Sequence, residues 1–413
     1  MTGVPGDSPA QRWVPVGVAL AGVLLASANL RTAVAGLSPV LDRVAEDIDV
    51  PALLIGLLGA TPPLAFALGG VIAPALARRL GIEMTLVISL GAMVLGHLGR
   101  AVAPESAVLV LGSFAVLAGI GTATVLMPPL VKRYFPDRVG GMTAVYATVM
   151  AIGATIPPLV AVPLADAAGW RVSLGIWAVA VLLAVPPWIL AVAGNRRRLA
   201  HLHDEAATGS IELPPARLRV ERSRVAWAIT AIFTVSSLTA YTVFGWLPTI
   251  LVDVAGIGEA EAGALVALFA AMGIPIAFIA PVLASRMRSV APLVLLSVAL
   301  GVAGGGGLLI APTAAPWLWV ALLGLAPLLF PLAMYLMGAR TDTAEGAVAV
   351  SGFVNRAGYI IAAAGPLLIG VLHDATGGWA ASLALMTGWF LFAIPAAVVL
   401  HRPRSVEEEL AGR

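Results

Sequence analysis

Long apolar segments alternate with short polar ones along nearly the whole chain, and this pattern sets the first expectation about the fold. A transmembrane helix needs about 20 predominantly apolar residues. By that measure the pattern predicts twelve helices, near residues 13–38, 51–76, 83–102, 106–130, 139–165, 170–194, 223–251, 260–284, 290–311, 315–338, 345–372 and 378–401. The pattern therefore predicts an all-α membrane protein with a six-helix bundle over 1–194, a polar cytoplasmic linker over 195–222 and a second six-helix bundle over 223–413.

The composition supports a polytopic membrane protein. Of the 413 residues, 60% are hydrophobic and only 11% are charged, with a mean hydropathy of +0.98, whereas soluble domains have about 45–50% apolar and about 25% charged residues. The net charge of +2 is too small to indicate nucleic-acid binding, and the absence of cysteine excludes a disulfide framework and a thiolate metal site. The first apolar run is too long for a signal peptide, so we expect no cleaved leader.

Lysine and arginine are distributed unevenly between the two sides of the predicted helices. If both termini are cytoplasmic, 19 of the 24 Lys and Arg residues fall on the cytoplasmic side, and the remaining five are Arg31, Arg43, Arg100, Arg171 and Arg356. Cytoplasmic loops of membrane proteins carry such an excess of positive charge. We therefore expect a multi-pass protein of the bacterial plasma membrane with both termini in the cytoplasm.

The two sets of six helices repeat short sequence elements at nearly the same offset, 207 to 209 residues. "PALARRLG" at Pro74–Gly81 matches "PVLASRMR" at Pro281–Arg288, 207 residues later, and "ADAAGW" ending at Trp170 matches "HDATGGW" ending at Trp379. Because each half has six helices, both halves keep the same orientation in the membrane. This is the parallel-repeat architecture of the major facilitator transporters, and it predicts the major facilitator fold.

Two arginines lie inside predicted spans, where an arginine costs roughly 2.5–3.5 kcal/mol on the mildest scale. Arg31 lies in the first helix and Arg356 in the eleventh, and no Asp or Glu lies at mid-membrane depth in any span. An ion pair is thereby excluded as their purpose, which leaves capping of carbonyls, stacking on aromatic rings or binding of an anionic ligand. We expect both arginines to contact substrate, one from each half.

Other polar and aromatic residues of the spans are candidates for the same site. Asn29 is two residues from Arg31 and so points elsewhere on a helix, which favours an interhelical hydrogen bond over substrate contact. Asn355 neighbours Arg356, and either orienting the substrate or packing would explain it. For the tyrosines a packing role is the alternative to substrate contact, and for Trp246, near the outer end of helix 7, interfacial anchoring is the alternative to a gate. The tyrosines concerned are Tyr146, Tyr241, Tyr335 and Tyr359.

Three further residues are better explained by structure than by function. His97 lies on the third helix, where a packing role is favoured over proton transfer. Asp166 and Asp374 stand at matching outer helix ends before Gly-Trp corners, which indicates a structural corner in each half.

Several longer segments together resemble the cyanate and nitroimidazole transporter family of the major facilitators. They are "ANLRTAVAGLSPVL", "GIGTATVLMPPLVKRYFP", "YTVFGWLPTIL", "LFPLAMYLMGART" and "SGFVNRAGYIIAAAGPLLIGVLHDATG". The resemblance implies twelve helices, alternating access and small, often anionic or polar nitrogen-containing substrates. It matches Arg31 to the arginine of the family's helix 1 motif and Asn355 to a position where glutamine is usual. Arg356 departs from the family, which has a small residue there, and this hints at a substrate with more negative charge.

We accordingly expect a monomeric secondary transporter in the lipid bilayer, with a small-molecule substrate, no cofactor, no nucleic-acid partner and no enzymatic activity. The sequence contains no phosphate-binding loop and its histidines lack metal-ligand spacing. An exporter of toxic small molecules is the nearest alternative, and a sensor or channel is a more distant one.

Overall fold

The computed structural model describes residues 14–48, 52–206 and 218–412, and every regular element in this part of the chain is helical. Twelve spans in it are long and apolar enough to cross a membrane. In the N-terminal half the helices are α1 (Val16–Asn29), α2 (Thr32–Gly36), α3 (Leu41–Ala45), α4 (Ala52–Leu80), α5 (Ile82–Ala101), α6 (Ser106–Tyr134), α7 (Val139–Ala168), α8 (Trp170–Gly175) and α9 (Trp177–Ala206). In the C-terminal half they are α10 (Arg224–Ala255), α11 (Glu259–Arg286), α12 (Ala291–Ile310), α13 (Pro316–Leu325), α14 (Leu329–Ala339), α15 (Ala344–Thr376), α16 (Ala380–Gly388), α17 (Ile394–Leu400) and α18 (Val406–Ala411).

The twelve predicted helices are all found, and their bounds differ most clearly at the sixth and the first. Helix α9 continues to Ala206, so the first eleven residues after Asn195 extend the helix rather than begin a linker. Of the predicted linker, residues 207–217 lie outside the described residues. The first span is divided between α1 and α2, which the apolar pattern did not predict.

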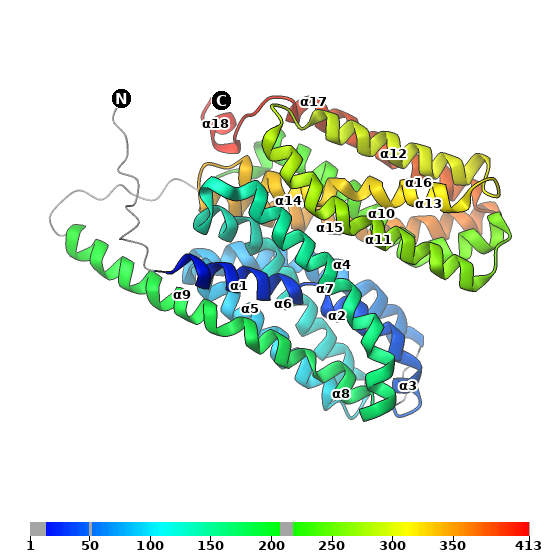
Figure 1. Cartoon of the computed structure of the whole chain (residues 1–413), viewed down its shortest axis with the longest axis horizontal. Coiled ribbons are helices and arrows are strands. Elements are labelled where there is room, and N and C mark those ends of the chain that lie inside the picture. Colours follow the sequence, from blue (N-terminus) through cyan, green and yellow to red (C-terminus); the bar gives the residue numbers. More distant parts are fainter. Residues whose placement is uncertain (1–13, 49–51, 207–217, 413) are drawn as a thin grey trace.

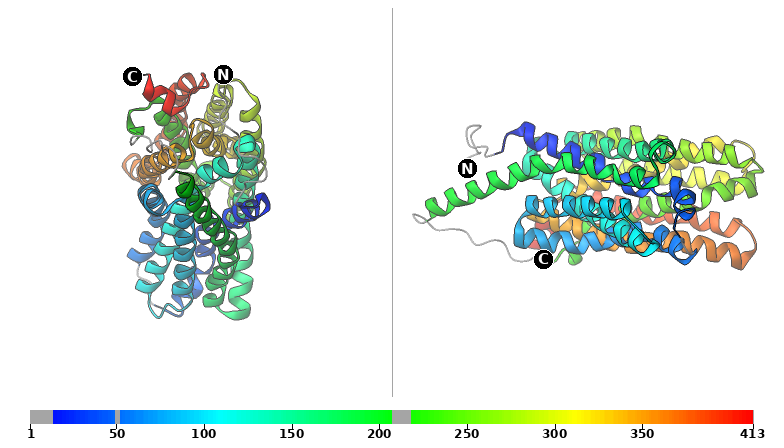
Figure 2. Two further views of the ribbon diagram at one scale, coloured as in Figure 1. Left: turned by 90° about the vertical axis from the view of Figure 1, so that its left-hand side faces the viewer. Right: turned by 90° about the horizontal axis from the view of Figure 1, so that it is seen from below.

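The two halves form two bundles whose helices run along a common long direction (Figures 1 and 2). Large apolar side chains cover the outside, including Leu159 at 73%, Ile310 at 85% and Val398 at 74% exposed. In water such a surface would drive aggregation, whereas in a bilayer these side chains contact lipid. The structure therefore agrees with a protein that spans the membrane many times.

Matching corners in the two halves support the internal repeat. The indole Nε1 of Trp170 donates to Oδ2 of Asp47 at 3.1 Å in the N-terminal half. At the equivalent corner of the C-terminal half, Trp379 Nε1 donates to Oδ2 of Asp253 at 2.7 Å. Each of these tryptophans is the last residue of the repeated Gly-Trp motif. Asp166, one of the two predicted corner residues, instead pairs with Arg43 at 2.7 Å, while Asp374 is exposed.

The halves touch at one end of the molecule, at the left of Figure 1, and their ribbons diverge towards the right. We call the left end the closed end. Gly70 of α4 meets α15 there so closely that a Cβ on it would lie 2.5 Å from the backbone nitrogen of Arg356. Lys132 of α6 donates to the carbonyl of Gly338 at 3.0 Å and to that of Thr341, both in the other half. The ammonium group thus binds one carbonyl in the last turn of α14 and one just beyond that helix, where carbonyls lack intrahelical partners.

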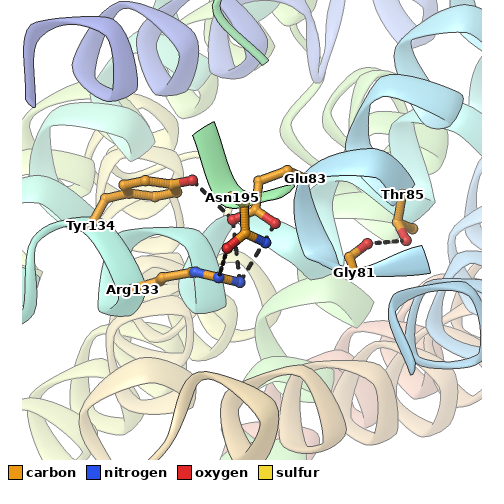
Figure 3. Close-up of polar contacts among 6 residues, drawn as sticks. All are labelled: Gly81, Glu83, Thr85, Arg133, Tyr134 and Asn195. Carbon is orange, nitrogen blue, oxygen red and sulfur yellow. Dashed lines mark hydrogen bonds and ion pairs between the residues drawn. The ribbon is translucent and has the colours of Figure 1, made fainter. Parts of the chain in front are cut away.

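A buried carboxylate organises the same end of the N-terminal half (Figure 3). Glu83 of α5 pairs with Arg133 of α6 at 3.2 Å and accepts a hydrogen bond from the Tyr134 hydroxyl at 2.8 Å. Arg133 also donates to Oδ1 of Asn195 on α9 at 2.9 Å. These contacts join α5, α6 and α9 at the closed end of the N-terminal half.

The short helix α18 is attached to the closed end of the C-terminal half. Its Glu409 accepts hydrogen bonds from the Ser223 hydroxyl at 2.6 Å and from the backbone N–H groups of Arg224 and Val225, each at 3.1 Å. A carboxylate at the start of a helix satisfies free N–H groups and interacts favourably with the helix dipole. The end of the chain therefore stabilises the start of α10.

Candidate substrate site

Arg31 lies at a break in the first membrane span. Helix α1 ends at Asn29, α2 begins at Thr32, and Arg31 between them has φ −131° and ψ −5°, outside the helical region. The expected continuous helix over 13–38 is thus wrong at this point. Broken helices are tolerated within membranes only where the freed backbone is covered by protein or lines a cavity. The break at Arg31 therefore lies inside the protein or at a cavity and not against lipid.

The guanidinium of Arg31 lies between aromatic rings from both halves. Its Cζ is 5.6 Å from the ring centroid of Phe66 on α4 and 5.3 Å from that of Phe330 on α14. Each cation–π contact is worth about 0.5–1 kcal/mol when exposed and about 2 when desolvated. None of the ion pairs among the described residues includes Arg31. The two rings therefore offset part of the free-energy cost of desolvating its charge.

Two tyrosines of the C-terminal half complete the surroundings of Arg31. The hydroxyls of Tyr241 on α10 and Tyr359 on α15 lie close enough to the guanidinium to interact with it electrostatically. Tyr359 also packs against Phe66 at 5.2 Å and Phe233 at 4.9 Å between ring centroids. We call Phe66, Phe233, Tyr241, Phe330 and Tyr359 the aromatic cluster. It encloses Arg31 with apolar walls and two hydroxyls, and both hydroxyls are buried without a hydrogen-bond partner of good geometry.

Asn355 lies one turn before Tyr359, on the same side of α15. It is 1% exposed, and its Nδ2 donates to the Ser351 carbonyl at 2.8 Å while its Oδ1 has no partner. An unsatisfied buried polar atom costs about 1–3 kcal/mol, which water or a solute in this region would recover. The structure thus groups Arg31, Tyr241, Tyr359 and Asn355 of the predicted site residues.

Sequence reasoning missed the rings of Phe66, Phe233 and Phe330 and three small side chains with hydroxyl groups. Thr234 and Ser237 of α10 and Ser351 of α15 are buried, and their side-chain oxygens have no partner. On α10 these hydroxyls precede Tyr241 by seven and four residues, and Ser351 precedes Asn355 by four. That spacing places the hydroxyls on the same side of their helix as Tyr241 or Asn355, and it could have been recognised in the sequence.

Arg356 lies elsewhere. Its side chain is exposed, with Cζ 5.9 Å from the ring centroid of Phe353, and it has no contact with the aromatic cluster. Along α15 it shares a stripe with the exposed Ile360, Leu367 and Val371, which lie 4, 11 and 15 residues later on the same side of a helix. The predicted pair of arginines facing one another across the site is therefore not what the structure contains.

The remaining predicted site residues occupy other positions. Asn29 donates to the Ala180 carbonyl on α9 at 3.2 Å, which is the interhelical bond that the sequence favoured. Trp246 donates to the Pro366 carbonyl at 2.8 Å and so joins α10 to α15 within one half. Tyr335 lies near Arg340, at the closed end. Tyr146 is buried on α7 with an unpartnered hydroxyl, and no contact joins it to Arg31.

His97 is likewise remote from Arg31 and serves packing within the N-terminal half. It is fully buried, and its Nδ1 lies 3.1 Å from the Leu174 carbonyl on α8. This contact joins α5 to α8.

Comparison with known proteins gives a consistent result. Residues 23–363 match the family model of the Major Facilitator Superfamily. The chain is 32% identical over 375 residues to the 2-nitroimidazole transporter of Escherichia coli (strain K12), covering 89% of this chain and 91% of that protein. It is 24% identical over 385 residues to the cyanate transport protein CynX of the same organism, covering 91% and 96%.

The fold is similar to that of the proton:xylose symporter XylE, with a TM-score of 0.73 at 13% identity over 96% of this chain and 98% of that one. At that identity the likeness shows the fold alone. Family model, relatives and architecture agree, and the chain belongs to the Major Facilitator Superfamily of secondary transporters.

Proposed function

We propose that this transporter moves a small anionic or polar nitrogen-containing solute across the bacterial plasma membrane, and that Arg31 binds it. The observation that carries the proposal is a guanidinium between the two halves, with aromatic walls and no ion-pair partner among the described residues. Arginine stays charged in proteins. A solute with negative charge would therefore be attracted to this position.

The surroundings also favour a particular shape of solute. Guanidinium is a planar fork that binds a planar anion through two hydrogen bonds, and aromatic walls suit a flat, unsaturated molecule. The unpartnered hydroxyls of Tyr241 and Tyr359 supply further donors. The names of the two relatives, which refer to 2-nitroimidazole and cyanate, agree with small, flat, nitrogen-containing molecules.

Alternating access is the mechanism that this arrangement supports. Arg31 belongs to the N-terminal half, whereas Phe330, Tyr241 and Tyr359 belong to the C-terminal half, so a solute bound among them would couple the halves as they rock. The closed end carries most of the lysines and arginines, which by the positive-inside rule is the cytoplasmic side. We infer an outward-facing state of a monomeric carrier, with both termini in the cytoplasm.

Binding to the purified protein tests the proposal. Thermal unfolding would be followed with cyanate, nitrate and 2-nitroimidazole as probes and glucose as an uncharged control, because a ligand that binds the folded state raises the midpoint. We expect at least one anionic or nitrogen-containing probe to raise the midpoint of the native protein and not that of Arg31→Gln. No stabilisation by any of the three, or equal stabilisation of Arg31→Gln, would contradict the proposal. Counterflow in proteoliposomes then separates a carrier from a channel, because only a carrier exchanges labelled for unlabelled solute.

Export of a small nitrogen-containing molecule is a second candidate, since a relative at 32% identity is named a 2-nitroimidazole transporter and the name leaves the direction open. Cells that lack an exporter become sensitive to the compound, whereas cells that lack an importer fail to use it. Growth of a deletion strain with 2-nitroimidazole, and with cyanate as the nitrogen source, distinguishes the two.

A further inference from the structure

Another arginine of the N-terminal half, Arg100, is fully buried and has no contact with the proposed transport site among those found for the described residues. Arg100 lies in the last turn of α5 and is 1% exposed. Its Nε and Nη2 are buried and donate to nothing, and it takes part in none of the ion pairs among the described residues. Within the described part of the chain, Arg100 is thus a buried cation without a counter-ion.

The two unpartnered atoms have a geometric relationship. Nε–H and Nη2–H point from the same edge of the planar guanidinium, and this edge binds carboxylates and other anions through two parallel hydrogen bonds. Both donors that a single anion would use are therefore free.

Two more polar atoms without a hydrogen-bond partner lie on the helices that pack together beside Arg100. Gly112 of α6 packs against Arg100, and a Cβ on it would lie 3.1 Å from the Arg100 Cγ. The next residue, Ser113, is 3% exposed, and its hydroxyl has no partner. His97, one turn before Arg100 and within electrostatic reach of it, directs Nδ1 to the Leu174 carbonyl and leaves Nε2 unpartnered. Because a carbonyl only accepts, Nδ1 carries the proton, and Nε2 of the neutral ring is left as an acceptor.

The buried charge of Arg100 favours a bound counter-ion. The C-terminal end of α5 favours a cation through the helix dipole, but this effect is smaller than the penalty for burying a charge without a partner. A water molecule would accept from Arg100 and donate to Nε2 of His97, yet it would leave the positive charge uncompensated. An anion compensates both the charge and the hydrogen bonds.

We propose that Arg100 and Ser113 hold a small monovalent anion such as chloride between α5 and α6. The anion accepts from Nε and Nη2 of Arg100 and from the Ser113 hydroxyl, and water bridges it to His97. It is a fixed component of the N-terminal half and stabilises the packing of α5 on α6. It is distinct from the solute at Arg31.

Thermal unfolding of the purified protein tests this. Sodium chloride or bromide replaces sodium gluconate at constant ionic strength, since gluconate is too large for a site between packed helices. We expect the midpoint of the native protein to rise with chloride and then saturate. Arg100→Gln should lose this rise, while Arg31→Gln and the surface variant Arg43→Gln should keep it. The Arg31→Gln control separates failure of this site from failure of the transport site.

Two results would overturn the inference. One is an identical midpoint for the native protein in gluconate, chloride and bromide, which would indicate water at Arg100. The other is a chloride response in Arg100→Gln equal to that of the native protein. If Arg100→Gln does not fold, Arg100→Lys keeps the charge without the two-donor edge, and we expect it to need at least tenfold more chloride for half the rise. Ser113→Ala should need severalfold more, and a native-like response of both variants would equally refute the site.

Discussion

The guanidinium of Arg31, from the N-terminal half, lies 5.3 Å from the ring centroid of Phe330, from the C-terminal half. A charge and the ring that stabilises it thus belong to two bodies that are joined by contacts at the closed end. Any rearrangement of the halves changes this contact. The relationship makes the surroundings of Arg31 depend on the conformation of the protein.

Arg31→Gln should weaken substrate binding about ten- to hundredfold, because one charge-assisted contact is worth about 1.5–3 kcal/mol. Arg31→Lys should be a poor substitute, since ammonium lacks the planar fork. Binding to detergent-solubilised protein at matched expression measures both. Arg356→Gln is the matched control, because its exposed side chain lies away from the aromatic cluster. If Arg356→Gln also weakens binding tenfold, the position of that side chain in the working transporter differs from the one described.

Tyr359→Phe should weaken binding about two- to tenfold without destabilising the fold. The hydroxyl makes no hydrogen bond of good geometry and interacts only electrostatically with Arg31, so its removal costs the free protein little. A neutral hydrogen bond to solute, in contrast, is worth about 0.5–1.5 kcal/mol. Binding and thermal unfolding are measured on the same preparation. Tyr335→Phe, near Arg340 at the closed end, should bind normally. Unchanged affinity in Tyr359→Phe would show that its hydroxyl does not reach the solute.

A disulfide across the closed end should stop transport. A Cβ built at Gly338 lies 3.4 Å from Cγ1 of Val139 in the other half, and the chain has no native cysteine to interfere. Val139→Cys with Gly338→Cys should therefore cross-link on oxidation and block exchange in proteoliposomes, and a reductant should restore it. Each single variant serves as a control. Full exchange by the oxidised pair, with cross-linking verified by mass, would argue against alternating access at this end.

Glu83→Gln should lower the free energy of unfolding by about 1–3 kcal/mol. Removing the carboxylate leaves Arg133 without its ion-pair partner, and loss of one partner of a buried pair is strongly destabilising. Because the Arg133 side chain is 24% exposed, water offsets part of the loss. Denaturant unfolding in detergent measures the change, with Glu46→Gln on the exposed surface as a control. Equal stability of the two variants would mean that the contacts in Figure 3 contribute little.

Asp47 should make the stability of the N-terminal corner depend on pH. Hydrogen bonds from Arg171 and then Trp170 hold the pKa of Asp47 below its ordinary value. With the folded pKa lowered, the contribution is fully present above the unfolded pKa of about 3.9 and is lost as pH falls through the folded value. The melting midpoint of Asp47→Asn should therefore lie below that of the native protein at pH 6, and the difference should shrink below about pH 4. Asp253→Asn, whose carboxylate accepts from Trp379 without a neighbouring arginine ion pair among the described residues, should show a smaller difference.

The sequence by itself determined the number of helices and their division into two repeats, and it singled out Arg31 as a candidate site residue. These follow from local properties: twelve apolar runs of membrane length, matching elements at nearly the same offset, and a charge in an apolar segment without a carboxylate at its depth. The interhelical hydrogen bond expected of Asn29 is present, and His97 contacts the Leu174 carbonyl within its own half, as a packing residue would.

Only the tertiary structure decided which sides of the helices face one another. In a membrane the lipid-facing side of a helix is as apolar as its buried side, so periodicity could not tell that Arg356 shares the outer stripe of Ile360 while Tyr359 faces inward. The break at Arg31 was hidden for the same reason, since apolar residues continue through it. The aromatic cluster joins residues of four helices far apart in the chain, and only the packing of the two halves brings their rings to one charge.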